Sequence, residues 1–242
     1  MSVTDRKKAL AFYKLALNYP QGSSTSQNFF DQSIKADPTF SFAYFEKSVP
    51  FNKRGDYHSG FSLLNKAVEL NPKRHLGYRG WLKLVKVKDY QGALKDFKIL
   101  QGINPNIKNV WSHNINYLKG ICFMGVNDYD RALIEFNKAK NVNSYLFKGI
   151  IYYRLGVYDK AIRDLKICSE LSPKCTEAYY FIGQIYFDLK EKKLSEINLK
   201  KALILYGKGF INKNAYNEFH EELYFSDIEE AFSKLSKLDT IP

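Results

Sequence analysis

Two short patterns in the sequence have residue types that are found in catalytic or ligand sites. Residues 220–224 read His-Glu-Glu-Leu-Tyr, which begins like a zinc-protease helix but has tyrosine where the second histidine ligand must stand. Residues 207–209 read Gly-Lys-Gly and continue with Phe-Ile-Asn, which matches neither a dinucleotide fingerprint nor a phosphate loop. The chain also lacks a Gly-x-Ser-x-Gly elbow for a nucleophilic serine. The sequence therefore predicts no enzyme, no cofactor and no metal site.

Histidine and cysteine, the other residues that carry chemistry, are scattered. The four histidines each stand near an expected turn or helix end, where we expect solvated side chains: His58, His75, His113 and His220. Cys122 and Cys168 are expected to be buried thiols. Cys175 follows a proline in an expected turn and could react, but nothing around it indicates catalysis.

The overall composition is that of a folded chain with an uneven distribution of charge. Its 242 residues are 45% hydrophobic and 26% charged, and the formal net charge is +12. Residues 73–108 hold nine Lys or Arg against two acids, and residues 189–213 hold seven Lys against two acids. Residues 214–242 hold seven acids against two lysines. No stretch approaches the roughly 18 to 20 apolar residues that span a bilayer, and the first residues do not resemble a secretory signal, so we expect a cytoplasmic protein.

Prolines and turn motifs recur with a period near 34 residues. Pro38 and Pro72 are 34 residues apart, Pro72 and Pro105 are 33 apart, and Pro105 and Pro173 are 68 apart. Each follows Asp, Asn or Ser and closes an apolar stretch of helical period, as expected where a helix must stop.

A second register places a tyrosine at the start of a helical pattern in four repeats, at Tyr57, Tyr90, Tyr129 and Tyr158. A third places glycine inside helices, at Gly80, Gly120, Gly149 and Gly183. Each such glycine costs about 1 kcal/mol relative to alanine. A recurring cost needs a recurring reason, and we expect that two helices approach closely at each glycine.

These three registers together resemble the tetratricopeptide repeat, a helical hairpin of 34 residues. The best match is the stretch 145–173, in which cysteine replaces the preferred alanine at Cys168. The resemblance implies an all-α right-handed solenoid that forms a single domain over residues 1–242. We expect about six hairpins and a C-terminal capping segment of one or two amphipathic helices, with these limits: 9–38, 41–72, 74–105, 113–141, 142–173, 176–207 and, for the cap, 210–242.

Two further features depart from a regular repeat. Pro50 stands well inside the first helix of the second hairpin, where proline removes a hydrogen bond, and we expect a kink or break there. Residues 106–112 form a longer connection than the other linkers.

In such a stack the first helix of each hairpin lines a concave groove. Stepping from the small residue of each first helix by helical geometry predicts the lining. The predicted residues are largely aromatic and aliphatic: Phe42, Phe45, Val49, Asn52, Arg74, Trp81, Leu84, Asn114, Tyr117, Ile121, Met124, Asn143, Leu146, Ile150, Tyr153, Arg154, Glu177, Tyr180, Gln184, Phe187 and Asp188. Because an aromatic stripe at helical spacing is often core, many of them could be buried instead, and the C-terminal helix could fill the groove itself.

The predicted function is that of a scaffold or adaptor that binds a peptide or an amphipathic helix in this groove. Family members that hold a chaperone carboxylate use Lys, Asn and Arg at these positions, and the aromatic residues here disfavour that ligand. Asn114, Asn143 and Arg154 could still bind a peptide backbone or a carboxylate. One alternative is binding of RNA or single-stranded DNA through the basic stretches, with Trp81 and Trp111 stacking on bases. Another is a structural module that associates with itself. The sequence does not identify the partner or the oligomeric state.

Overall fold

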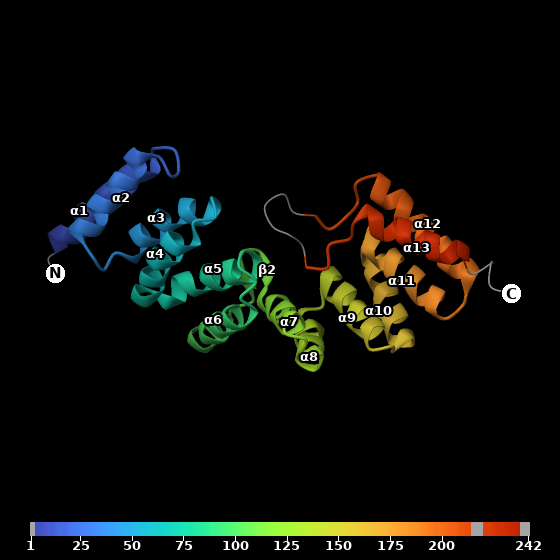
Figure 1. The fold of residues 1–242 in the computed structure, drawn as a ribbon. Helices are drawn as coiled ribbons and strands as arrows, with labels where there is room; N and C mark the ends of the chain where they lie inside the picture. Colours follow the sequence, from blue (N-terminus) through green and yellow to red (C-terminus); the bar gives the residue numbers. More distant parts are fainter. Residues whose placement is uncertain (1–2, 214–219, 238–242) are drawn as a thin grey trace. The chain divides into compact units, whose positions relative to one another are not determined.

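The described part of the chain is built from helices that pair into hairpins (Figure 1). The computed structural model describes residues 3–213 and 220–237. Within these ranges the successive hairpins are α1 (Val3–Leu17) with α2 (Ser24–Ala36), α3 (Ser41–Lys53) with α4 (Tyr57–Leu70), α5 (Pro72–Val85) with α6 (Tyr90–Ile103), α7 (Ile115–Gly125) with α8 (Tyr129–Ala139), α9 (Val142–Arg154) with α10 (Tyr158–Leu171), and α11 (Thr176–Asp188) with α12 (Lys192–Gly207). A single helix, α13 (Phe225–Lys237), follows.

The all-α repeat fold predicted from the sequence is confirmed. The hairpins follow the predicted limits except at the N-terminus, where α1 already begins at Val3. From Asp5 onward its buried residues are alanines, Ala9 and Ala16, which give a weak apolar signal. The long connection 106–112 contributes to a pair of two-residue strands, β1 (Asn109–Val110) and β2 (His113–Asn114), the one sheet within the described residues.

The chain divides into two compact units, Met1–His113 and Asn114–Pro242. Unit 1 contains the first three hairpins, and unit 2 contains the next three hairpins and α13. The single domain expected from the sequence stays a prediction, and each unit is described by itself below.

The recurring tyrosine motif marks the start of a second helix, because the aspartate before the tyrosine is the N-cap. The side chains of Asp56, Asp89 and Asp128 accept a hydrogen bond from the backbone N–H three residues later. Each bond satisfies one of the amide groups that a helix start leaves without a partner. In the fifth hairpin valine stands at the cap position and makes no such bond.

The mid-helix glycines make room for a bulky side chain of the second helix. A Cβ atom at Gly120 would lie 2.5 Å from the ring of Phe136, and one at Gly149 would lie 2.5 Å from Leu165. Gly80 faces Phe97 and Gly183 faces Leu199 in the same way. The recurring cost of glycine therefore has the expected cause, close approach of two helices, although the nearest atoms belong mainly to an inserted side chain.

An ion pair with a buried carboxylate, which the sequence analysis did not anticipate, accompanies three of these glycines. In each case the cation directly precedes the glycine and the acid directly precedes the bulky residue. The pairs are Arg79–Asp96 at 2.7 Å, Lys119–Glu135 at 3.0 Å and Lys148–Asp164 at 3.2 Å. A cation and an acid 16 or 17 residues apart were visible in the sequence, but only the hairpin brings them into contact.

Helix α3 continues through Pro50, so the chain does not break there. Pro50 lies in the last turn, where its carbonyl still accepts a hydrogen bond from the N–H of Arg54 at 3.2 Å. Its ring packs closely on Gly22 in the turn between α1 and α2, where a Cβ would lie 2.8 Å from that of proline. Gly22 has a φ of +84°, which favours glycine in any case.

The C-terminal part of the chain forms the helix α13, whose buried residues are Ile228, Ala231 and Leu235. It packs against Leu199 of α12 and closes the end of unit 2, as expected of a capping helix. Tyr216 and Phe219, also expected in this amphipathic segment, lie outside the described residues. None of the helices in the described ranges is long and apolar enough to cross a membrane.

Candidate binding surface on the first helices

The side chains predicted to line a groove differ widely in exposure. We call them the first-helix surface, and their role in binding stays a prediction. Buried members are Val49, Asn52, Leu84, Tyr117, Ile121, Met124, Leu146, Ile150 and Glu177. Half-buried members are Phe42, Phe45, Trp81, Asn114, Asn143, Tyr153, Tyr180, Gln184 and Phe187. Arg74, Arg154 and Asp188 are exposed.

In unit 1 three members of the first-helix surface, Phe42, Phe45 and Trp81, belong to a continuous row of aromatic rings that runs from α3 to α5. His75 lies between Phe42 and Phe45, with ring centroids at 5.5 and 4.9 Å. Phe45 in turn contacts Tyr78 at 5.1 Å. His75 and Tyr78 were not predicted as part of this surface. Helical steps back from Gly80 reach positions 77 and 74, and each of these two residues lies one position later.

The row continues from Tyr78 to Trp81 at 6.1 Å and from Trp81 to Trp111 at 6.3 Å. Trp111 comes from the turn between β1 and β2 and also contacts Tyr78 at 5.3 Å. We call Phe42, His75, Phe45, Tyr78, Trp81 and Trp111 the aromatic row. Its last member is 58% exposed, so the row ends in solvent at an indole ring.

His75 corrects the expectation of a solvated histidine. Its side chain is buried, with 1% of its surface exposed, and Nε2 lies 3.1 Å from Oγ of Ser41. Burial, followed by the charge of Arg74, lowers the pKa of His75 from 6.5 to about 4. Burial also raises the pKa of Tyr78 to about 12, with a smaller contribution from the Glu46 carboxylate. The row is therefore uncharged at neutral pH.

The lowered pKa of His75 predicts a loss of stability in mild acid. The unfolded chain takes up the proton near pH 6.5 and the folded chain only near pH 4, so stability is intact above pH 6.5 and falls as the pH drops toward 4. Across this pH window we expect the free energy of unfolding of wild type to fall by about 2 kcal/mol more than that of His75→Phe. Urea unfolding followed by tryptophan emission measures it. If both proteins lose the same stability between pH 6.5 and pH 4, the lowered pKa of His75 is contradicted.

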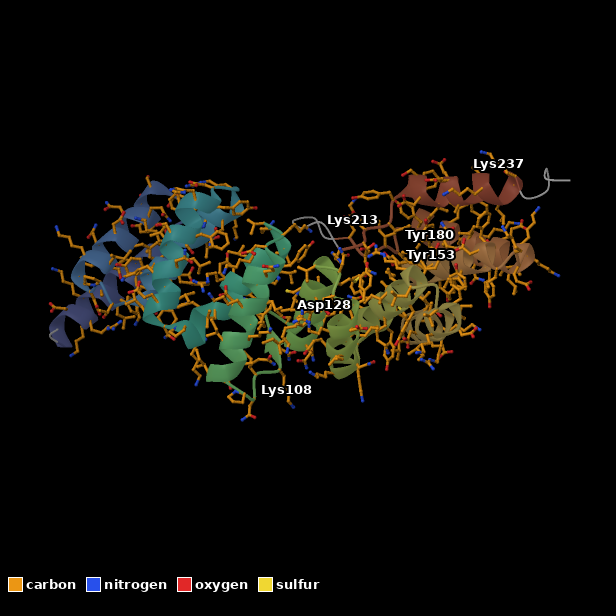
Figure 2. The ribbon with its side chains drawn as sticks, turned by 60° about the horizontal axis from the view of Figure 1, so that its bottom comes forward. Lys108, Asp128, Tyr153, Tyr180, Lys213 and Lys237 are labelled. Carbon is orange, nitrogen blue, oxygen red and sulfur yellow. The ribbon has the colours of Figure 1, made fainter. Side chains whose placement is uncertain are left out.

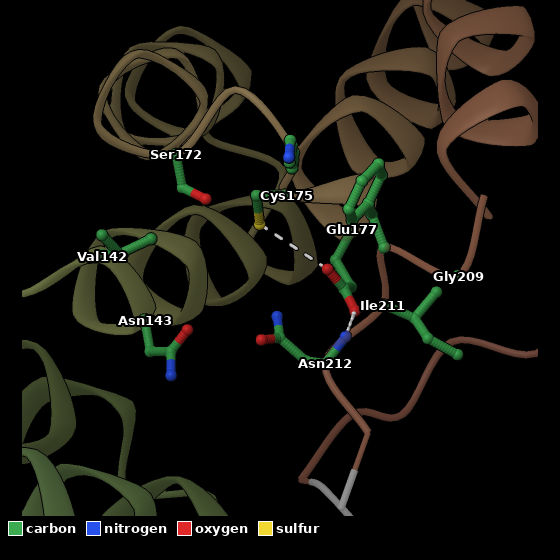
Figure 3. Close-up of a pocket in the computed structure, with 10 residues that line it drawn as sticks. Val142, Asn143, Ser172, Cys175, Glu177, Gly209, Ile211 and Asn212 are labelled. Atoms are coloured by element: carbon green, nitrogen blue, oxygen red, sulfur yellow. Dashed lines mark hydrogen bonds between the residues drawn. The ribbon is translucent and has the colours of Figure 1, made fainter.

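In unit 2 the chain's own C-terminal segment lies on the first-helix surface. We use this name for the described residues 208–213 and 220–224. The backbone N–H of Asn212 donates to Oε1 of Glu177 at 2.6 Å (Figure 3). The hydroxyl of Thr176 donates to the carbonyl of Phe210, and Lys174 lies over the Phe210 ring at 4.3 Å.

The second stretch of the C-terminal segment contacts α9. Arg154 forms an ion pair with Glu221 at 2.6 Å. The ring of His220 lies 5.8 Å from that of Phe147, so this half-buried histidine is also not simply solvated. Arg154 and Glu177, both predicted as groove residues, thus bind the same chain that carries them.

The remaining aromatic residues of this surface are also engaged. Tyr180 and Phe187 pack on the cluster that α13 forms with Leu199. Figure 2 labels Tyr153 and Tyr180 on the neighbouring first helices α9 and α11. Burial and the nearby Asp188 carboxylate raise the pKa of Tyr153. The first-helix surface of the sixth hairpin is therefore covered by the chain itself.

A cavity of about 220 Å³ remains beside the C-terminal segment, between Asn143, Ser172, Glu177 and Asn212 (Figure 3). Cys175 borders it but is buried, which corrects the expectation of a reactive thiol in a turn. Its sulfur lies 3.4 Å from that of Cys168 and 3.6 Å from Oε2 of Glu177. The contact with Cys168 and burial raise the pKa of the Cys175 thiol, which keeps it protonated.

Among the described residues, no group of three or more His, Cys, Asp or Glu side chains is placed to hold a metal ion. Gly207 ends α12, and His220 and Glu221 contact α9 through Phe147 and Arg154 respectively. The arrangement offers surfaces for contact, with aromatic rings in unit 1 and polar groups that hold a backbone in unit 2.

Comparison with known proteins identifies the repeat. A family model described as "Tetratricopeptide repeat" matches residues 142–175 and 176–206, the fifth and sixth hairpins. The chain contains tetratricopeptide repeats. The resemblance stated from the sequence is thereby confirmed, and the matched limits agree with the predicted repeats that begin at residues 142 and 176.

One sequence relative and two solved structures show what the chain is similar to. Anaphase-promoting complex subunit 3 of Schizosaccharomyces pombe is 23% identical over 185 residues, which are 74% of this chain and 27% of that protein. The chain thus spans about a quarter of the length of this relative. The structure of PilW, a type IV pilus biogenesis factor, matches with a TM-score of 0.63 and 12% identity. The match covers 82% of this chain and 94% of the PilW chain. YrrB, described as a tetratricopeptide-repeat protein with an unusual peptide-binding site, has a TM-score of 0.56 and 17% identity, and covers 73% of this chain and 91% of its own.

Proposed function

We propose that the chain is a protein-interaction module that holds a non-helical polypeptide segment on the first helices of its tetratricopeptide repeats. One observation carries the proposal: the first helices of unit 2 already contact a non-helical stretch of polypeptide. Phe210 and Asn212 are contacted through their backbone, and Glu221 through its side chain. Repeats of this family generally bind protein or peptide partners, and the chain's own segment indicates which contacts such a partner can make.

The contacts with the C-terminal segment combine two kinds of recognition. Glu177 accepts a backbone N–H, which any residue except proline can donate. Arg154 binds a carboxylate through a charge-assisted hydrogen bond, which selects Asp, Glu or a chain terminus. Together they describe a non-helical ligand with at least one acidic group. The "unusual peptide-binding site" of YrrB supports a peptide ligand for a fold of this kind.

The alternative of single-stranded nucleic acid has one observation in its favour. Unit 1 holds 18 Lys or Arg against 8 Asp or Glu, a net charge of +10, and unit 2 holds 19 against 17, a net charge of +2. However, Arg79 and Lys83, two cations of the first helix α5, both bind the buried carboxylate of Asp96. A phosphate backbone needs a series of available cations, so we favour a polypeptide. Non-enzymatic action and a cytoplasmic location belong to the same proposal.

Selection of a random peptide library on the intact chain tests the proposal. Peptides that bind wild type should bind Phe45→Ala or Tyr153→Ala about tenfold more weakly, because truncating an interface aromatic typically costs more than 1 kcal/mol. Phe45 represents the first-helix surface of unit 1, and Tyr153 that of unit 2. Fluorescence anisotropy of the labelled peptides gives the dissociation constants.

Ile134→Ala and Ile197→Ala are the matched controls, because these residues are 53% and 55% exposed on the second helices α8 and α12. Both controls should leave affinity within about twofold. The proposal is wrong if no peptide is enriched, or if the second-helix controls weaken binding as much as the first-helix variants.

A further inference from the structure

Trp111 is a large apolar side chain that the turn between β1 and β2 holds in solvent. It is 58% exposed, whereas Trp81 beside it is half-buried on α5. We propose that the Trp81–Trp111 pair of unit 1 is a docking site for an apolar side chain carried by an acidic polypeptide segment. This inference rests on the proposed function and names the site and the chemistry of the partner.

The backbone that presents Trp111 is held in an unfavourable conformation. Trp111 and Ser112 are the two residues between β1 and β2, and their φ angles are +49° and +66°. A two-residue hairpin turn with both φ angles positive favours glycine, asparagine or aspartate, and a side chain as large as indole is disfavoured there. Residues held in sparsely populated regions tend to cluster at functional sites. Here the turn places an indole where a glycine would be accommodated without strain.

The neighbouring rings fix the orientation of Trp111. Its ring lies nearly parallel to that of Trp81, at 29° and 6.3 Å, and contacts Tyr78 at 5.3 Å. Tyr78 is buried against Phe45, so the exposed indole rests on a packed base. A rigid aromatic group that is held in place before binding loses little entropy on contact, which is why tryptophan is enriched among residues that dominate binding energy.

Charge identifies the partner as acidic. The net charge of +10 on unit 1 attracts an acidic segment over a distance of about one Debye length and raises its rate of association. Arg74 is exposed beside Phe42, and Lys108 is exposed shortly before the turn. The half-buried Glu46, whose carboxylate acts on Tyr78 beside Trp111, opposes this attraction, but the net charge of unit 1 outweighs it.

The two tryptophans of the chain both belong to this site, so intrinsic emission reports on it without a label. The decisive pair of variants is Trp111→Gly and Ser112→Gly. Both place glycine at a positive φ and so preserve the turn, but only the first removes the indole. Peptides selected from a random library on the intact chain, at about 0.15 M salt, serve as the probe.

We expect the selected peptides to be enriched in Asp and Glu around an apolar residue and to change the tryptophan emission of wild type. Trp111→Gly should weaken their binding about 30-fold, the effect of losing a dominant contact. Ser112→Gly, and Ile103→Ala at an exposed position of α6, should stay within about twofold. Raising the salt concentration should lower the association rate constant and change the dissociation rate constant much less.

Three outcomes overturn the inference. In the first, the selected peptides bind Trp111→Gly as tightly as wild type but lose affinity for Phe45→Ala or Tyr153→Ala, so that the proposed function survives and this site fails. In the second, the peptides carry no excess of acidic residues. In the third, oligothymidylate changes the tryptophan emission at lower concentration than any selected peptide, which would make the site a base-stacking platform. If no peptide is enriched at all, the proposed function fails with it.

Discussion

Replacement of Gly149 by valine is expected to destabilise unit 2 by about 3 kcal/mol or more, because the first added carbon already overlaps a packed side chain. A Cβ at this position would lie 2.5 Å from Cγ of Leu165 and 3.3 Å from the carbonyl oxygen of Ala161. The leucine is fully buried, and the carbonyl belongs to helix backbone, so neither can withdraw easily. The gain in helix propensity on replacing glycine, less than 1 kcal/mol, is too small to compensate.

Urea unfolding followed by circular dichroism at 222 nm measures this effect. Gly207→Ala is the matched control, since Gly207 lies in α12 of the same unit and a Cβ there would meet nothing within 4 Å. The control should leave stability unchanged or increase it slightly. Shortening Leu165 to alanine in a Gly149→Ala background should recover part of the loss caused by Gly149→Ala. A valine variant as stable as the Gly207 control would show that the two helices do not pack as described.

Removal of the Asp96 carboxylate is expected to destabilise unit 1 by about 3 kcal/mol, because two cations then lose their partner in a partly buried site. Arg79 binds both oxygens of Asp96, at 2.7 and 2.9 Å, and Lys83 binds one of them at 3.0 Å. The carboxylate is 1% exposed. Asp96→Ala removes the charge and leaves space, whereas Asp96→Asn retains the shape and one acceptor, so the asparagine variant should lose less.

Tryptophan emission during urea unfolding reports this change, because both tryptophans are in unit 1. Glu69→Ala is the control: Glu69 pairs with Lys66 at 2.8 Å on the exposed face of α4, and such surface pairs contribute little. We expect no measurable change for Glu69→Ala. If Asp96→Ala has as small an effect, the buried pair does not stabilise the hairpin. A stabilising role would then not be expected for the matching pairs Lys119–Glu135 and Lys148–Asp164 either.

Features that depend on interactions within one helix or turn could be predicted from the residues alone. Helix limits follow from the apolar period and from prolines, and the second helices begin where Asp56, Asp89 and Asp128 cap their own backbone. The glycines at 120 and 149 indicated a close approach of two helices, since glycine is costly in any helix that lacks such a contact. Six helical hairpins were therefore predictable from the sequence.

The exposure of the first-helix residues, in contrast, depends on packing between elements and could not be predicted. Leu146 and Phe45 occupy equivalent steps of their helices, yet the first is buried and the second is half-buried. The exposure of such residues depends on what segments distant in sequence contribute, as when Glu221 reaches Arg154 across 67 residues. Likewise, His75 is buried because α3 packs over it, and Trp111 joins the aromatic row because a two-residue turn projects it there. A helical period describes one element at a time, and these outcomes depend on contacts between elements.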